Sequence, residues 1–192
     1  MEELLVILDS CVIFPMPLCD TLLRVAEAEL YDLRLSQEIL DGATRNLVKN
    51  GKMTDAKAAR FQTAIKNTFP DAMVEVPPEL VELMTNHPGD RHVLAAAIIA
   101  KAKIIVTDNL KHFPQEALEP YGIEVQNPDV FLTQLFDNDP ESMVEVIRQQ
   151  AEDLKKPPIT VAELLDNLET NNRVQEFASR VRFYELPSRN GG

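Results

Sequence analysis

Cysteine is scarce in this chain, with only Cys11 and Cys19 among 192 residues. A disulfide framework in a chain of this length needs more cysteines, and a zinc site with four ligands would need partners of other types. The count therefore argues against a disulfide-stapled fold. We expect both cysteines to be small apolar residues of the core.

Long apolar runs and a basic N-terminus are also lacking. The longest apolar stretch falls far short of the roughly 20 residues that a membrane-spanning helix needs. The first residues, Met1-Glu2-Glu3-Leu4, lack the basic region of a signal peptide. We therefore expect a cytoplasmic protein that has no membrane contact.

Positive charge is in the minority, because 19 Lys and Arg stand against 31 Asp and Glu and give a formal net charge of −12. Non-specific nucleic-acid binders usually show the opposite balance, so any RNA contact must be local or assisted by metal ions. One segment departs from this balance. It could follow an RNA backbone or form the solvated face of a helical hairpin, and its basic residues are Arg45, Lys49, Lys52, Lys57, Arg60 and Lys66.

What the chain does have is an alternation of short apolar runs with amphipathic stretches. The continuous runs at 4–8 and 104–107 are typical of strands buried on both faces. Helices with Ser, Thr or Asp caps are predicted between the strands. The alternation predicts an α/β fold, a three-layer α/β/α domain around a central parallel sheet. Further strands are predicted at 31–35, 72–76 and 122–125.

The pattern changes after about residue 136, because no further strand is evident. An amphipathic helix is predicted at 142–154, and a capping-box pattern opens another at Thr160. We predict an α/β domain over residues 1–136 and a helical C-terminal extension over residues 137–192.

Three aspartates mark places where predicted strands and helices meet. Asp9 and Asp108 follow the two most apolar strands, and Asp90 opens an Ala-rich helix. Ligands of open α/β sheets bind beyond the carboxyl ends of the strands. Three carboxylates that converge there would repel one another without a cation. The spacing therefore suggests a hard-metal site and phosphate chemistry.

These motifs together resemble a PIN domain over roughly residues 3 to 135. No single motif is specific, but their order and spacing are. The segment Leu154-Lys155-Lys156-Pro157-Pro158-Ile159-Thr160 is similar to an extension in one branch of the VapC-type toxins. The matching motifs are Leu4 to Pro15, Ser36 to Leu40, Asp90 to Ala97, Ile105 to Pro114, Tyr121 to Glu124 and Pro128 to Leu132.

The resemblance implies a Mg²⁺- or Mn²⁺-dependent endoribonuclease, usually the toxin of a bacterial toxin–antitoxin pair. It implies an RNA substrate, a cognate antitoxin and a homodimer. Asp9 and Asp108 would be direct metal ligands, and Asp90 would bind a second ion or orient water. Thr107 and Ser10 could steady these carboxylates by hydrogen bonds.

One departure from the family pattern concerns its fourth acid. The family usually carries a Glu where this chain has Gly42. Asp41 is the adjacent residue, and Glu38 lies one helical turn earlier on the same face. Either acid could substitute as a metal ligand, or the site is one acid short. In the second case the protein would be a catalytically weak or inactive PIN-fold binding module.

Histidine is also rare, since the chain has only His87, His92 and His112. The three lack the close ligand spacing of a zinc site. We therefore expect them to serve surface or helix-packing roles.

Overall fold

The computed structural model describes residues 4–13 and 15–185, and it divides the chain into two compact units. Unit 1 takes residues up to 14 together with 31–127. Unit 2 takes residues 15–30 together with those from 128 onward. We predicted a boundary at residue 136, whereas the second unit includes a helix before residue 31 and resumes at Pro128.

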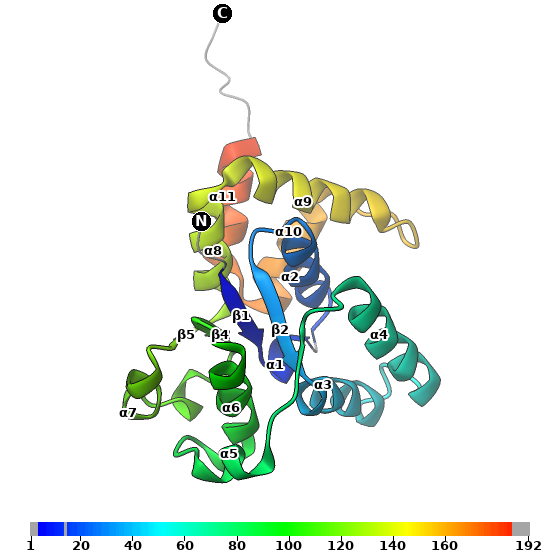
Figure 1. Cartoon of the computed structure of the whole chain (residues 1–192). Helices are drawn as coiled ribbons and strands as arrows, with labels where there is room; N and C mark the ends of the chain where they lie inside the picture. The colour runs from blue at the N-terminus through cyan, green and yellow to red at the C-terminus, as the bar shows by residue number, and fades with distance from the viewer. Residues whose placement is uncertain (1–3, 14, 186–192) are drawn as a thin grey trace, which may run out of the picture. The chain divides into compact units, whose positions relative to one another are not determined.

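Unit 1 is built on a parallel sheet with the strand order β3-β2-β1-β4-β5. The central strand β1 (Leu5–Leu8) pairs with β2 (Asp32–Ser36) on one side and with β4 (Ile104–Val106) on the other (Figure 1). The outer strands are β3 (Met73–Val74) and β5 (Glu124–Gln126). The five parallel strands with helical crossovers confirm the predicted α/β class.

The inner strands are the apolar runs of the sequence. In β1 the residues Val6, Ile7 and Leu8 are buried, and all of β4 is buried. Val6 is opposite Ile104, and Leu8 is opposite Val106. The chain proceeds from β1 to one side of the sheet and later returns to the other side. The carboxyl ends of β1 and β4 thus form the switch point where such sheets bind ligands.

The helices of unit 1 begin largely at the predicted caps. Ser36 accepts a hydrogen bond from Ile39 N (3.3 Å) at the start of α3 (Gln37–Lys49), and Thr54 does the same for α4 (Asp55–Thr68). Helix α6 (Arg91–Ala100) packs on β1, β2 and β4, where its small side chains allow close approach. The remaining helical elements are α1 (Ser10–Ile13), α5 (Pro78–Leu83), η1 (Pro88–Asp90), η2 (Leu110–His112), α7 (Gln115–Leu118) and η3 (Glu119–Tyr121).

The regular elements of unit 2, within its described residues, are all helices, apart from an isolated bridge between Lys155 and Pro158. Its elements are α2 (Leu18–Glu27), α8 (Pro128–Asn138), α9 (Pro140–Asp153), α10 (Val161–Asn172) and α11 (Gln175–Glu185). This confirms the predicted helical C-terminal region. The capping box at Thr160 and Glu163 is also confirmed, because both of its hydrogen bonds form.

Polar contacts specify how the helices of unit 2 pair. Thr21 of α2 donates to Gln150 Oε1 of α9 at 2.8 Å, and both side chains are fully buried. The Asp129 carboxylate of α8 accepts from Phe177 N (2.9 Å) in the first turn of α11. Asp20 lies in the first turn of α2, which begins at Leu18, and it forms an ion pair with Arg24 at 3.0 Å.

Membrane helices are absent from the part of the chain that the structure describes, since no helix there is long and apolar enough to cross a bilayer.

Candidate metal and nucleic-acid site

Asp9 lies at the switch point, directly after β1, and only 1% of its surface is exposed. Its Oδ2 accepts a hydrogen bond from Thr107 Oγ1 at 2.7 Å, and its Oδ1 accepts one from Ser10 Oγ at 3.2 Å. These are the two hydroxyls that the sequence suggested as supports. A buried carboxylate is costly unless such donors, or a cation, compensate its charge.

Cys11 gives Asp9 a third donor, with Sγ at 3.3 Å from Oδ2. Burial, together with the negative charge of Asp9, raises the pKa of the Cys11 thiol to about 12. The sulfur therefore keeps its proton at neutral pH and can donate to the carboxylate. The predicted core role of Cys19 agrees with the structure, where it is 1% exposed.

Thr107 connects the ends of the two central strands. Its Oγ1 donates to Asp9 and accepts from Asn109 N at 3.0 Å. Asp9 N in turn donates to Val106 O at 3.0 Å. Asp108 is the next residue along the chain. It is exposed, and its backbone N–H points to Cys11 Sγ at 3.4 Å.

Asp90 lies at the N-cap position of α6, but its side chain makes no capping hydrogen bond. Instead, Asp90 Oδ2 lies 2.5 Å from His112 Nδ1 and 4.0 Å from His87 Nδ1. The two imidazole rings stack with centroids 4.0 Å apart. The structure thus brings together two histidines for which we expected surface or packing roles.

Within residues 4–13 and 15–185, the one group of three possible metal ligands whose donor atoms all lie within 4.8 Å of one another is His87, Asp90 and His112. Asp9, Asp90 and Asp108 do not form such a group. Asp9 and Asp108 follow neighbouring strands, and Asp90 instead joins the histidines. The sequence signal for this arrangement was weak. Only the short turn from His87 to Asp90 is local, and His112 comes from the loop after β4.

Gly42, at the position of the expected fourth acid, faces the start of α1. A Cβ on Gly42 would lie 3.3 Å from Ser10 Cβ and 3.4 Å from Ser10 Oγ. A longer side chain would therefore start out beside the residue that follows Asp9. The position where the resemblance places an acid therefore faces Ser10, and here it offers no carboxylate.

The two possible substitutes point elsewhere. Asp41 Oδ1 accepts from Gln37 Nε2 (2.8 Å) and from Gln62 Nε2 (3.0 Å) of α4. Glu38 is exposed, and its Oε1 lies 4.0 Å from His92 Nδ1. Neither acid belongs to a three-residue ligand group of the kind defined above, among the residues described.

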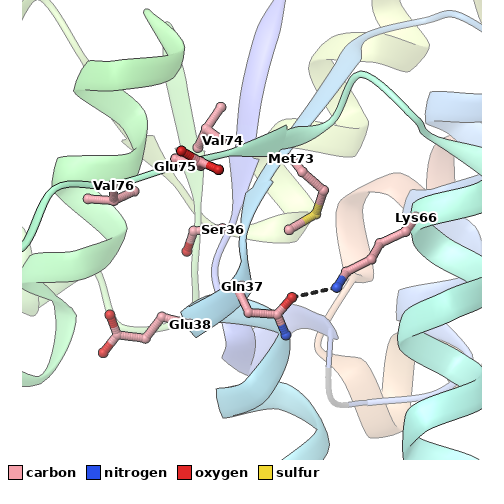
Figure 2. Close-up of a pocket in the computed structure, with 8 residues that line it drawn as sticks. All are labelled: Ser36, Gln37, Glu38, Lys66, Met73, Val74, Glu75 and Val76. Carbon is pink, nitrogen blue, oxygen red and sulfur yellow. Dashed lines mark hydrogen bonds between the residues drawn. The ribbon is translucent and has the colours of Figure 1, made fainter.

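Glu38 also lines an open pocket of about 500 Å³ beside the carboxyl ends of β2 and β3. Figure 2 shows its carboxylate extending away from the pair formed by Lys66 and Gln37, whose Nζ and Oε1 are 2.5 Å apart. Glu75 brings a second carboxylate to the same pocket. The pocket therefore presents more negative than positive charge.

A second hollow of about 480 Å³ lies between α3 and α4. Arg45 and Lys49 line it from α3, together with Asp41 and Asp55. Lys52, in the connection between the two helices, is exposed and does not line it. Two of the three predicted RNA-contact residues thus share one groove.

Comparison with known proteins shows what this chain is similar to. Residues 128–183 match the family described as the VapC50 C-terminal domain. A protein of Mycobacterium tuberculosis (strain H37Rv) named "Putative ribonuclease VapC50" is 44% identical over 104 residues, which are 54% of this chain and 60% of that protein. The chain resembles a VapC-type PIN ribonuclease with a C-terminal extension. No solved structure matches.

The resemblance predicted from the sequence is therefore confirmed. The match covers about three fifths of the length of VapC50. The VapC50 C-terminal match begins at Pro128, which is also where unit 2 resumes after the sheet. Helix α8 thus falls within the VapC50 C-terminal family match, whereas we predicted an extension that begins at residue 137.

Proposed function

We propose that this protein is a metal-dependent endoribonuclease, the toxin of a toxin–antitoxin pair, which hydrolyses RNA phosphodiester bonds. The observation that carries the proposal is the Asp9 carboxylate, buried at the sheet's switch point in a chain that resembles VapC-type ribonucleases. The expected partners are an RNA substrate, a cognate antitoxin and a second copy of the chain.

The donor chemistry at the switch point fits Mg²⁺ or Mn²⁺. These ions prefer carboxylate oxygens, and Mg²⁺ typically uses one or two carboxylates and keeps several waters. A bound ion would activate water and stabilise negative charge on the phosphate. Asp9 would hold it directly. Asp108 would be a second direct ligand, and Asp90 would bind a second ion or orient water, which does not require the three carboxylates to meet within 4.8 Å.

The residues around Asp9 have a positioning role in this proposal. Thr107 and Ser10 fix one carboxylate oxygen each, so that Asp9 meets the ion in one orientation. The Cys11 thiol adds a third, weaker donor to the same carboxylate, with Sγ 3.3 Å from Oδ2.

Cleavage of a broad RNA pool by tag-free protein, freed of antitoxin and supplied with Mn²⁺, tests the proposal. We expect fragments from the wild type, and none from Asp9→Asn. Induction of the wild type but not of Asp9→Asn should arrest bacterial growth, and co-expression of the antitoxin should restore it. An RNA pool left intact by the wild-type protein with Mn²⁺ would rule out the enzyme.

The groove between α3 and α4 is proposed to bind the RNA backbone. Reversing the charge of Arg45 and Lys49 should weaken RNA binding and, if two phosphate contacts are lost, lower the salt slope by about 1.4. Reversal of Lys101 and Lys103 is the matched control, since both are exposed, the net charge changes equally and neither residue lines the groove. Equal weakening by both pairs would mean that only overall charge matters. Lys52→Glu extends the test to the third predicted contact.

The second candidate function is a PIN-fold module that binds without cutting. Gly42 favours it, because no carboxylate occupies the position that faces Ser10. The hydrogen bonds of Asp41 to Gln37 and Gln62 favour it as well. This alternative predicts weak Mn²⁺ binding, and no growth arrest on overexpression.

A further inference from the structure

His87, Asp90 and His112 form a side-chain cluster on two loops of unit 1. His87 lies just before the turn η1 that precedes α6, and Asp90 lies in that turn. His112 lies in the turn η2 after β4. A backbone hydrogen bond from His87 N to His112 O (3.0 Å) ties the two loops together. One donor atom from each side chain lies within 4.8 Å of the other two.

We propose that these three residues bind a divalent transition-metal ion of the zinc or cobalt type. Two imidazoles and one carboxylate are the ligands that such ions prefer, whereas Mg²⁺ prefers oxygen ligands only. Three protein ligands also match the number found in zinc sites that keep one position open for water or substrate. The site is separate in its chemistry from the carboxylates at the switch point, although Asp90 is common to both.

To hold an ion, His87 Nδ1 must release the hydrogen bond that it accepts from Gly89 N (3.2 Å), and the ligand atoms must shift. Zinc bonds of about 2.0–2.2 Å place neighbouring ligand atoms roughly 3.3 Å apart in a tetrahedral shell. The present separations from Asp90 Oδ2 are 2.5 Å to His112 Nδ1 and 4.0 Å to His87 Nδ1, on either side of that value. The stacked rings must also tilt, since the nitrogen lone pair lies in the ring plane. The His87 side chain is 52% exposed and has room to turn.

Two other observations point to a ligand at these loops. Asp90 stands at the N-cap of α6, yet its carboxylate is directed to the histidines and makes no capping bond. Asn86, the residue before His87, is 2% exposed, and neither atom of its side-chain amide has a hydrogen-bond partner in the described part of the chain. Buried polar atoms without partners are rare, and an ion or its bound water is one way to satisfy them.

Co²⁺ titration of the tag-free, full-length protein tests the site, with the visible absorption of Co²⁺ as the readout. We expect saturation at one ion with no displacement by excess Mg²⁺. Removing a residue that only hydrogen-bonds to a metal ligand typically lowers metal affinity about 10–100-fold. His87→Ala and His112→Ala each remove a direct ligand, so each should lower Co²⁺ affinity by at least that factor. His92→Ala is the matched control, because it removes the remaining histidine of the chain.

His112→Gln separates metal binding from folding, since Gln can still donate to Asp90 but is a poor ligand. It should fold as the wild type does and lose the Co²⁺ spectrum. The site is refuted if no Co²⁺ spectrum appears, or if His92→Ala weakens binding as much as the other two. Loss of the spectrum in Asp9→Asn, with no loss in the histidine variants, would also refute it. The readout does not involve RNA, so failure here is distinct from failure of the proposed nuclease.

Discussion

Replacing Thr107 by Val should destabilise the protein through the carboxylate of Asp9. Valine keeps the shape of the side chain and removes the hydroxyl. That hydroxyl is fully buried, donates to Asp9 Oδ2 at 2.7 Å and accepts from Asn109 N at 3.0 Å. Asp9 would keep Ser10 Oγ at 3.2 Å and the weakly donating thiol of Cys11 at 3.3 Å.

The magnitude follows from the hydrogen bonds to Asp9 and from Asn109 N, since the third contact of the hydroxyl, with Cys11 Sγ at 3.3 Å, is weak. A hydrogen bond to a charged group contributes about 1.5–3 kcal/mol, and one between neutral groups about 0.5–1.5 kcal/mol. We therefore expect Thr107→Val to lower the free energy of unfolding by about 2–4 kcal/mol at neutral pH without added metal. Urea unfolding measures this change, and an unchanged m-value would show that the unfolded state is the same.

Two controls isolate the hydroxyl. Thr107→Ser keeps the donor and removes one methyl group, which should cost about 0.5–1.5 kcal/mol, as small truncations in a core do. In the Asp9→Asn background, Thr107→Val should cost at least about 1 kcal/mol less, since contacting residues couple in double-mutant cycles. A loss below about 0.5 kcal/mol, or the same loss in both backgrounds, would show that this hydrogen bond does not hold the Asp9 charge.

Three further predictions concern other acids. Gly42→Glu should raise Mn²⁺ affinity relative to Gly42→Gln, measured by titration calorimetry, because a side chain there starts beside Ser10; equal affinities would refute this. Asp41→Asn should leave Mn²⁺ affinity unchanged, since its carboxylate is held on the α4 side, and a clear drop would contradict that placement. Asp139 caps α9, and hydrogen bonds from Ser142 lower the pKa of its carboxyl group. The stability that this gives is present above the pKa of Asp139 in the unfolded chain, and it is lost as the pH falls through the pKa of Asp139 in the folded protein. Asp139→Ala should cost about 1 kcal/mol of stability, and Asp139→Asn less. Unfolding curves between pH 2 and 7 measure both changes. A wild-type stability that does not fall as the pH is lowered would contradict the prediction.

Much of the fold could be read from local sequence patterns. The runs at 4–8 and 104–107 contain β1 and β4, of which residues 6–8 and 104–106 are buried, because continuous apolar residues suit the inside of a parallel sheet. The caps at Ser36, Thr54 and Thr160 form because their hydroxyls reach backbone N–H groups a few residues ahead. The edge strands were harder to predict from the sequence. Strand β3 has only two residues, where we predicted five. Edge strands carry a weaker apolar signal.

The sequence by itself determined that Asp9, Thr107 and Asp108 come at the ends of two buried strands, since continuous apolar runs mark such strands. The sheet topology of the structure makes these two strands neighbours. Only the tertiary structure decided the rest. It placed His112 against Asp90, turned Asp41 to Gln62 and grouped α2 with the C-terminal helices. The physical reason is the separation along the chain of the residues that interact. Caps and strand burial depend on neighbours within a few residues, whereas these contacts join segments far apart in the chain.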